Sequence, residues 1–467
     1  MKLQRIILEI LRNPSGKVLV SFLLLILIGA AVLRMPFASV DGIAFYDALF
    51  TSTSAVCVTG LIVLDTGKDF TFAGQLVILT LIQIGGLGFM TMANWFLLSL
   101  RRKTGLLGNY YMIEQSFGAI SRVNPRVLIK RVFFYTFIVE IVGALILYLR
   151  FSSDFESSHA LWLAIFHSIS AFCNAGFSLF TESLMGYSGD LTINMTILGL
   201  IILGGIGFIV FSEVFDFTVR KFQHKPKINM SLHSSVVLKT TFWLIVITSV
   251  IIFIFEYINV NSGRGVGESA LTSVFQSVTC RTAGFNTVET ANLTNASLLI
   301  VIFLMVVGGS PGSTAGGIKT STFAIIICTL KARVFNRKDV EISNRRVPAS
   351  YVSKAFATMM AYVAVMTISI IILEITEFGF NSHTKSIIDA GGVAREAFLD
   401  HLFEVVSALS TVGLSTGVTG TLSSGGMMVI MLCMFIGRLG PLFIAASFVG
   451  SRTSLDFSYP EGEVMVG

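Results

Sequence analysis

The sequence predicts an all-α polytopic membrane protein built from four repeats around a central axis. Three observations support this fold class: the composition, a set of long apolar stretches, and a motif that recurs four times. The 467 residues are 54% hydrophobic and only 13% charged, whereas soluble domains carry about 25% charged residues. So few charges cannot cover a water-facing globule. The composition therefore excludes a soluble enzyme, a disordered chain and a secreted disulfide scaffold.

Eight apolar stretches are long enough to cross a bilayer, which takes about 20 residues. They lie near residues 17–34, 74–99, 128–149, 191–218, 236–258, 294–331, 353–375 and 426–449. Each pair encloses a shorter apolar segment that predicts a re-entrant helix, near residues 43–56, 160–173, 267–280 and 395–410. Because Arg34-Met35-Pro36 follows the first stretch instead of a small-residue cleavage site, we expect an uncleaved first span.

The charged residues predict the orientation of these spans. Lysine and arginine gather in the N-terminus and in the linkers 100–131, 220–239 and 331–354, whereas the opposite loops hold few basic residues and several acids. By the positive-inside rule, the basic linkers and both termini are cytoplasmic, which agrees with an even number of spans. The net charge of +6 fits a basic membrane face better than it fits nucleic-acid binding.

A shared motif begins in each of the four short segments. Its copies are Phe50-Thr51-Ser52-Thr53-Ser54, Phe166-His167-Ser168-Ile169-Ser170, Phe275-Gln276-Ser277-Val278-Thr279 and Phe403-Glu404-Val405-Val406-Ser407. A glycine follows nine or ten residues after each phenylalanine, at Gly60, Gly176, Gly284 and Gly413. A second glycine cluster follows in each next span, at Gly85-Gly86, Gly204-Gly205, Gly308-Gly309 and Gly437. The chain therefore divides into repeats at 1–100, 101–219, 220–331 and 332–450, followed by a cytoplasmic tail at 451–467.

This repeat has a physical consequence for cations. A short helix that enters from outside and stops halfway directs its C-terminal partial negative charge toward the bilayer centre. Glycine then lets the returning strand turn its carbonyls toward the axis without strain. Four such strands predict a central pore with a ring of carbonyls that replaces the hydration shell of a monovalent cation. The predicted filter residues are Val58, Thr59, Gly60, Asn174, Ala175, Gly176, Thr282, Ala283, Gly284, Thr411, Val412 and Gly413.

At this point the residues resemble the ion-conducting subunit of the Ktr/Trk/HKT potassium transporter superfamily over nearly the whole chain. The most specific matches are Arg281-Thr282-Ala283-Gly284-Phe285, the loop at 308–317 and the tail from Tyr459 to Gly467. The short N-terminus is similar to that of the bacterial Ktr branch, and Gly60 at the first filter position implies selectivity for potassium. The resemblance further implies a homodimer in a bacterial plasma membrane, with Gly467 near the dimer contact. It also implies docking on a cytoplasmic ring of nucleotide-binding RCK subunits.

The second span of the third repeat is broken, because residues 308–317 hold five glycines and Pro311. Broken helix at membrane depth lines a cavity or is buried in protein, and here it would obstruct the pore. The resemblance implies that this is a gating loop. The predicted gate residues are Gly308, Gly309, Ser310, Gly312, Gly316, Gly317, Lys319 and Arg438. Arg438 either lines the pore as an electrostatic barrier or pairs with backbone carbonyls to hold two helices together. Lys319 either lines the pore or snorkels to the cytoplasmic surface.

Other polar residues in apolar segments have two interpretations each. Arg281 either braces the filter through carbonyls or touches the ion. Helix pairing is favoured over a proton relay for Glu140, Glu256, Glu374, Glu213 and Asp216, and close helix packing is favoured for the second glycine clusters. His167 and the five cysteines are expected to be buried core residues.

No metal-site spacing or nucleophile–base set occurs. We therefore expect no enzyme activity and no cofactor, with potassium as the transported ion and sodium open as an activator.

Three alternatives follow from the same residues. A secondary transporter with alternating access predicts inverted repeats and paired charges at mid-membrane, but these repeats all run in one orientation. A membrane-embedded enzyme needs His, Asp or Cys residues clustered at depth, and the sequence offers none. A sodium-permeable or sodium-coupled transporter on the same architecture stays open.

Overall fold

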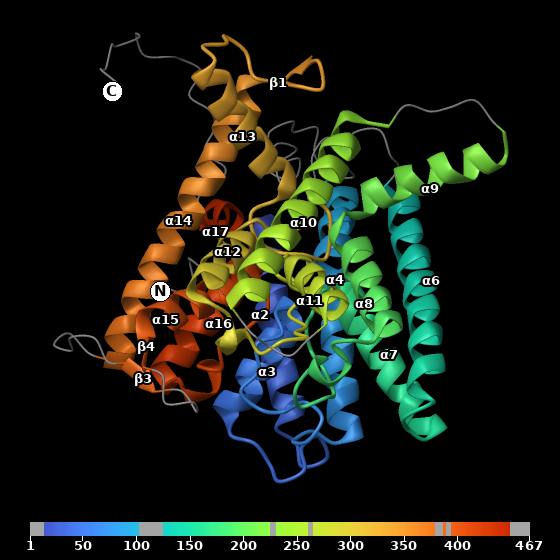
Figure 1. Cartoon of the computed structure of the whole chain (residues 1–467), viewed down its shortest axis with the longest axis vertical. Helices are drawn as coiled ribbons and strands as arrows, with labels where there is room; N and C mark the ends of the chain where they lie inside the picture. Colours follow the sequence, from blue (N-terminus) through green and yellow to red (C-terminus); the bar gives the residue numbers. More distant parts are fainter. Residues whose placement is uncertain are drawn as a thin grey trace.

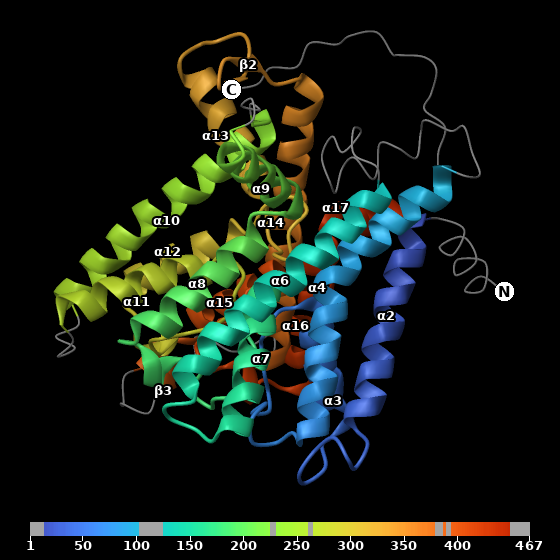
Figure 2. The same cartoon turned by 90° about the vertical axis from the view of Figure 1, so that its right-hand side faces the viewer.

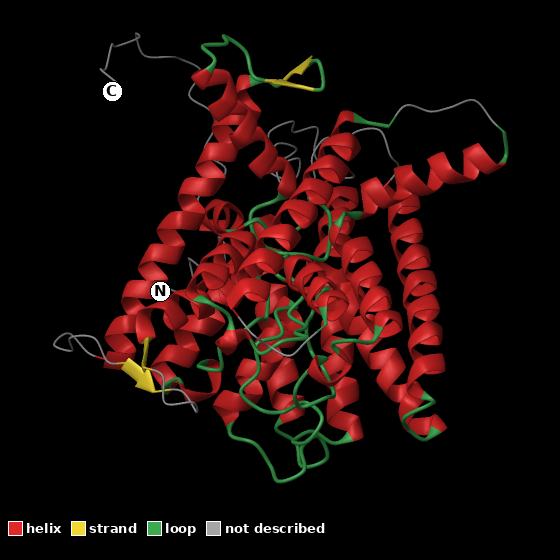
Figure 3. Ribbon diagram, in the orientation of Figure 1, coloured by secondary structure: helices red, strands yellow, loops and turns green. Residues whose placement is uncertain are grey.

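The computed structural model describes residues 14–101, 125–224, 230–259, 265–378, 386–388 and 394–448. This part of the chain is helical apart from loops and two short antiparallel strand pairs (Figure 3). The predicted tail at 451–467, the basic residues within positions 1–13 and positions 102–124 of the first basic linker lie outside the described residues.

The helices recur in sets of a first helix, a short helix and a second helix. The first set is α2 (Pro14–Leu33), α3 (Phe45–Cys57) and α4 (Phe72–Arg101); the second is α6 (Pro125–Phe151), α7 (Ser157–Cys173) and α8 (Leu191–Gly205), extended by α9 (Phe208–Phe222). The third is α10 (Leu232–Asn259), α11 (Val266–Thr279) and α12 (Asn295–Val306), extended by α13 (Thr320–Val334). The fourth is α14 (Ala349–Phe378), α15 (Ala397–Ser410) and α16 (Ser424–Leu439), extended by α17 (Pro441–Phe448). The short helices begin and end within three residues of the four predicted re-entrant segments.

The loops carry the remaining small elements. Single 3-10 turns are η2 (Met185–Tyr187), η3 (Thr290–Asn292) and η4 (Thr419–Thr421). Strand β1 (Glu341–Ile342) pairs with β2 (Arg345–Arg346), and β3 (Ser386–Ile388) pairs with β4 (Ala394–Glu396). The β1–β2 hairpin and α13 lie at one end of the molecule, opposite the loop that joins α3 to α4 (Figure 1).

Four helices in the described residues combine the length and hydropathy needed to cross a bilayer, namely α2, α6, α10 and α14. The second helices are less uniform. α4, α12 and α16 contribute the shorter apolar stretches Phe72–Gly88, Asn295–Val306 and Ser424–Leu439. α8 and α9 together are long enough for a span but are bent by 109°.

Glycines explain why two predicted continuous spans are wrong. The stretch 191–218 breaks at Ile206 and Gly207, where Gly207 has a φ of +90°. A Cβ there would lie 2.6 Å from the carbonyl oxygen of Pro311, so this glycine also permits a close approach of the 308–317 loop. The stretch 426–449 breaks at Gly440, with a φ of +89°, before α17 begins. In the third set, the helix ends at Val306 and resumes at Thr320, as its glycine and proline content predicts.

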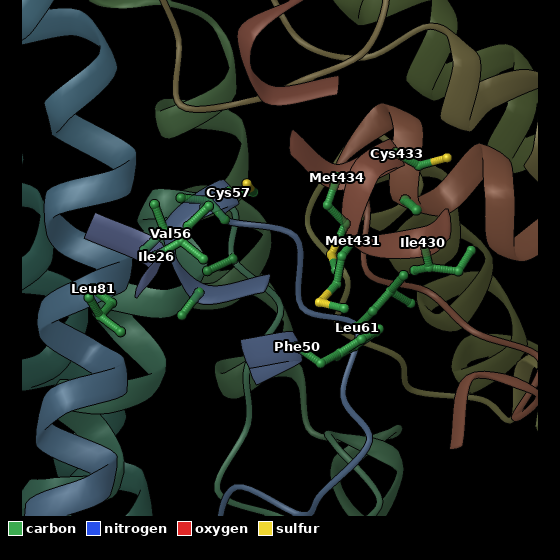
Figure 4. Close-up of a cluster of buried hydrophobic side chains, with 14 of the residues drawn as sticks. Ile26, Phe50, Val56, Cys57, Leu61, Leu81, Ile430, Met431, Cys433 and Met434 are labelled. Atoms are coloured by element: carbon green, nitrogen blue, oxygen red, sulfur yellow. The ribbon is translucent and has the colours of Figure 1, made fainter. Parts of the chain in front are cut away.

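The short helices lie at the centre of the molecule and are mostly buried. α3 packs against α2, α4 and α16. Leu61, which follows Gly60, lies in one apolar cluster with Phe50 of α3 and Met431 of α16 (Figure 4). The first and fourth sets therefore share a core, and that core supports the strand that follows α3.

Candidate ion pathway

Within three residues after each short helix, one residue turns the chain out of the helical path. Val58, Asn174, Thr282 and Thr411 have φ values of 57°, 59°, 75° and 53°. A left-handed conformation costs a non-glycine residue about 1–2 kcal/mol, and such strain gathers at functional sites. The glycine two residues later is also left-handed in every case, with φ values of 94°, 72°, 78° and 93°. The four predicted filter segments therefore share one unusual backbone conformation.

The four glycines form a closed ring. A Cβ on Gly60 would lie 3.1 Å from the Cα of Gly176, and one on Gly176 would lie 2.8 Å from the Cα of Gly284. A Cβ on Gly284 would lie 3.3 Å from the Cα of Gly413, and one on Gly413 would lie 3.1 Å from the Cα of Gly60. Each added Cβ would also meet the carbonyl oxygen of the residue that precedes the next glycine, at Ala175, Ala283, Val412 and Thr59. The ring therefore follows chain order and leaves no room for a side chain on its neighbour-facing side.

A hydroxyl side chain supports each segment from its own short helix. The hydroxyls of Ser54 and Ser407 accept from the N–H groups of Gly60 and Gly413, at 3.0 and 3.1 Å. The hydroxyls of Ser170 and Thr279 donate to the carbonyls just after the other two glycines, at 2.7 and 2.6 Å. These four residues occupy the fifth position of the repeated motif. Their role was not predicted from the sequence, although that shared position was the available signal.

The second glycine clusters pack against the ends of the short helices. A Cβ on Gly85, Gly204 or Gly437 would overlap a carbonyl oxygen in the last turn of the adjacent short helix, at Val56, Phe172 and Leu409 respectively. Glycine therefore lets the second helix approach the short helix closely.

The loop between α12 and α13 is held by α8 and its bend. The N–H groups of Ser310 and Thr314 donate to the carbonyls of Gly205 and Gly204, at 3.0 and 3.3 Å. The N–H of Phe208 donates to the carbonyl of Gly312 at 3.0 Å. Bonds between the two ends of the loop, from Ile318 to Val306 and from Thr320 to Gly309, are each 3.0 Å long.

The same loop touches the beginning of the fourth filter segment. A Cβ on Gly316 would lie 2.5 Å from the carbonyl oxygen of Ser410 and would overlap the hydroxyl of Thr411. Gly308 and Gly317 also lie against each other, since a Cβ on Gly317 would be 3.0 Å from the Cα of Gly308. The structure therefore brings Gly316 of the predicted gate against Thr411 of the predicted filter.

Arg438 joins this loop to α4. Its guanidinium donates to the carbonyl of Thr314 in the loop, and to the carbonyl of Gly85 at 2.7 Å. The side chain is buried. These contacts favour the alternative in which Arg438 pairs with backbone carbonyls. Lys319 behaves similarly within the loop, because its ammonium donates to the carbonyl of Ala315 at 2.7 Å.

Several other candidates lie away from the ring. Arg281 is buried and donates to the hydroxyl of Thr241 at 3.4 Å, so its described bond goes to α10 instead of to a carbonyl. Glu256 accepts from Thr294, Glu374 lies 3.0 Å from His401, and Asp216 pairs with Arg131 at 3.3 Å. Glu213 accepts from Ser231, so these carboxylates tie helices together. Cys57, Cys173, Cys280 and Cys433 are buried, and no cluster of metal-ligating side chains occurs in the described residues.

Two side chains at the second position of the motif contact the segment after the filter glycine. Nε2 of His167 lies 3.0 Å from the hydroxyl of Ser178. Glu404 is fully buried and accepts from the hydroxyls of Ser415 and Thr419, at 2.5 and 2.6 Å, and from the N–H of Thr416 at 3.1 Å. This role of Glu404 was not predicted, because nothing in one sequence tells where a carboxylate in an apolar helix will point.

Comparison with known proteins decides the family. The cation transport protein family TrkH matches residues 10–454. The chain belongs to the TrkH family of cation transport proteins. It is 36% identical to Ktr system potassium uptake protein B of Bacillus subtilis, over 97% of each chain. It is 33% identical to the potassium/sodium uptake protein NtpJ of Enterococcus hirae, again over 97% of each.

The fold agrees with this TrkH assignment. The crystal structure of the potassium transporter TrkH from Vibrio parahaemolyticus superimposes with a TM-score of 0.70, covering 93% of this chain and 84% of that one at 20% identity. Membership of a cation transporter family confirms the expectation that the chain is not an enzyme. Together with its apolar helices, it makes the chain a multi-pass membrane protein.

Proposed function

We propose that this TrkH-family chain is the potassium-translocating subunit of a bacterial potassium uptake system. The observation that supports this most is the closed ring of Gly60, Gly176, Gly284 and Gly413. Four backbone segments in one shared conformation surround an axis at the ends of four short helices. Carbonyl oxygens gathered in this way replace the water around a partly dehydrated monovalent cation, and the negative ends of the helix dipoles stabilise it.

The proposed pathway has two parts. Eight spans in order cross the membrane, some of them made of bent or broken helices, four short helices re-enter it, and the ion crosses the ring between them. The 308–317 loop then closes the pathway on the other side of the ring, held by Gly204, Gly205 and Arg438. Potassium passes down its electrochemical gradient when this loop moves aside.

The proposal also covers the orientation of the chain in the membrane and its partner proteins. The end that carries α13 and the β1–β2 hairpin is basic, with Arg337, Lys338 and Arg345, and is therefore assigned to the cytoplasm. The chain would work as a homodimer on an RCK-type nucleotide-binding ring, as the resemblance of its sequence to the Ktr/Trk/HKT superfamily implies. The relative from Bacillus subtilis is named as one protein of a Ktr system, which supports association with other components. Co-purification with such a ring, lost when the hairpin arginines are neutralised, is the expected result.

The decisive experiment is uptake of rubidium-86 into liposomes that hold the purified protein. We expect uptake that potassium blocks and that sodium blocks only weakly. Equal block by sodium, or uptake that needs an imposed proton gradient, would contradict a potassium-selective pore. A sodium-permeable or sodium-coupled transporter is the second candidate, because one relative is named a potassium/sodium uptake protein.

Glu404 is expected to strengthen cation binding. In the described residues its three partners are neutral donors on the segment after Gly413, so its charge is not cancelled by a basic partner among them. E404Q keeps the shape and removes the charge. We expect the concentration of rubidium that gives half-maximal uptake to rise severalfold, because a carboxylate charge near the pathway attracts a cation.

E377Q is the matched control for this charge. Glu377 lies in the same set of helices and accepts from the N–H and hydroxyl of Ser423, at 3.1 and 2.7 Å, at the beginning of α16. Its loss should leave the half-maximal concentration unchanged. A similar shift in both variants would mean that total charge matters and that the position of Glu404 does not.

A further inference from the structure

A buried carboxylate in α6 takes part in neither the ring nor the loop. Glu140 is only 4% exposed, in the middle of a helix long enough to span the membrane. An ionisable side chain at such a depth is costly and usually functional. Helix pairing alone would account for a hydrogen bond from Glu140 to a neighbouring helix, but the partner of Glu140 makes a further contact.

The contacts lead from Glu140 to the filter. Nε2 of Gln83 in α4 lies 3.1 Å from both carboxylate oxygens of Glu140. The other end of the same amide, Oε1, accepts from the thiol of Cys173 at 3.3 Å. Cys173 is the last residue of α7 and directly precedes Asn174, the first residue of the second filter segment. Glu140 therefore fixes the amide of Gln83 in the orientation that accepts from Cys173.

The surroundings make this chain of contacts stiff. α4, α6 and α7 pack against one another (Figure 2). The hydroxyl of Ser168 in α7 donates to the carbonyl of Glu140 at 2.7 Å. Gly86 leaves just enough space for Cys173, since a Cβ on Gly86 would lie 3.0 Å from the sulfur of Cys173. A displacement of Gln83 is therefore transmitted to the end of α7.

The fourth repeat has a counterpart made of different groups. The hydroxyl of Tyr362 in α14 lies 2.6 Å from the hydroxyl of Ser410, the last residue of α15. In both repeats, a polar side chain of the first helix is tied to the residue that directly precedes the filter segment. The second repeat uses Gln83 as an intermediate.

We propose that Glu140 is a positioning residue for the second filter segment, and that it acts through Gln83 and Cys173. This inference rests on the proposed potassium pathway. Its consequence is that discrimination between potassium and sodium depends on a carboxylate that never touches the ion.

The test is a double-mutant cycle with rubidium-86 uptake, in which potassium and sodium compete. E140A and Q83A should each lower the ratio of the two half-inhibiting concentrations by about three- to tenfold, and the double variant should lower it no further, since coupled residues are not additive. The swap E140Q/Q83E rebuilds an amide–carboxylate pair whose carboxylate still accepts from the thiol. It should restore most of the ratio. E256A is the control, because Glu256 accepts from Thr294 at the beginning of α12, away from the filter.

The outcomes separate the two proposals. If the wild-type protein does not discriminate potassium from sodium, the proposed function fails before the variants are compared. If the wild type discriminates, additive effects of E140A and Q83A, or a swap without rescue, would overturn the positioning role. A protein amount that falls in E140A while its ratio stays at the wild-type value would also overturn it, because Glu140 would then serve folding alone.

Discussion

Substituting Gly284 with serine is expected to lower the preference for potassium over sodium about tenfold or more, while the protein still folds and inserts. Gly284 has a φ of +78°, and a Cβ would lie 2.6 Å from the carbonyl oxygen of Val412. The obstacle is backbone of the next segment, which cannot rotate away as a side chain could. Because the carbonyls must shift to admit the Cβ, their fit to a dehydrated cation is lost. Competition of sodium with rubidium-86 uptake measures the change.

Gly417 provides a control with the same backbone strain. It follows the fourth filter segment with a φ of +96°, but a Cβ there would have no atom within 4 Å. G417S therefore strains the backbone as G284S does without displacing a neighbouring segment. We expect G417S to keep the wild-type preference for potassium. Loss of selectivity in both variants would attribute the effect to backbone strain and would remove the support for a carbonyl ring.

The sequence predicted what depends on local signals. The four short helices were predicted because each apolar segment is too short to span and ends before a glycine. The conformation at Gly60 and its three counterparts follows from the same signal, since a left-handed residue favours glycine. The break before Thr320 was predicted from the density of glycine and proline in one stretch.

The remainder depends on contacts between distant residues, which one sequence does not reveal. The bend at Gly207 was missed because the glycines at positions 204, 205 and 207 also fit close packing of a continuous helix. What requires the bend is the carbonyl of Pro311, about a hundred residues later. Similarly, only the packing of three helices brings Glu140 to Gln83 and Gln83 to Cys173, and no local pattern in the sequence reveals these contacts.

R438A is expected to raise rubidium uptake by the purified protein alone about tenfold. Arg438 donates to Thr314 in the loop and to Gly85 in α4, so it ties the loop to a neighbouring helix. A hydrogen bond from a charged donor contributes about 1.5–3 kcal/mol, and about 1.4 kcal/mol is enough to shift a closed–open equilibrium tenfold. Initial uptake rates, normalised to the amount of inserted protein, measure the change.

R438K separates the two roles considered for this residue. It keeps the positive charge, but a single ammonium lacks the planar fork that reaches two carbonyls in different directions. If Arg438 fastens the loop, R438K raises uptake nearly as much as R438A. If the charge itself is the barrier, R438K keeps the low wild-type rate. The two carbonyl contacts lead us to expect the first result.

Deletion of residues 309–316 should give the highest rubidium uptake rate, with which the rates of the Arg438 variants can be compared. The deletion joins two ends that already meet, because Val307 pairs with Ile318 and a Cβ on Gly317 would lie 3.0 Å from the Cα of Gly308. The shortened chain loses the loop bonds to Gly204 and Gly205 but keeps the four ring glycines, so we expect fast uptake that is still selective for potassium. A deletion variant as slow as the wild type would move the gate away from this loop. If the deletion variant takes up rubidium fast and R438A keeps the wild-type rate, the gate lies in the loop but Arg438 does not hold it closed.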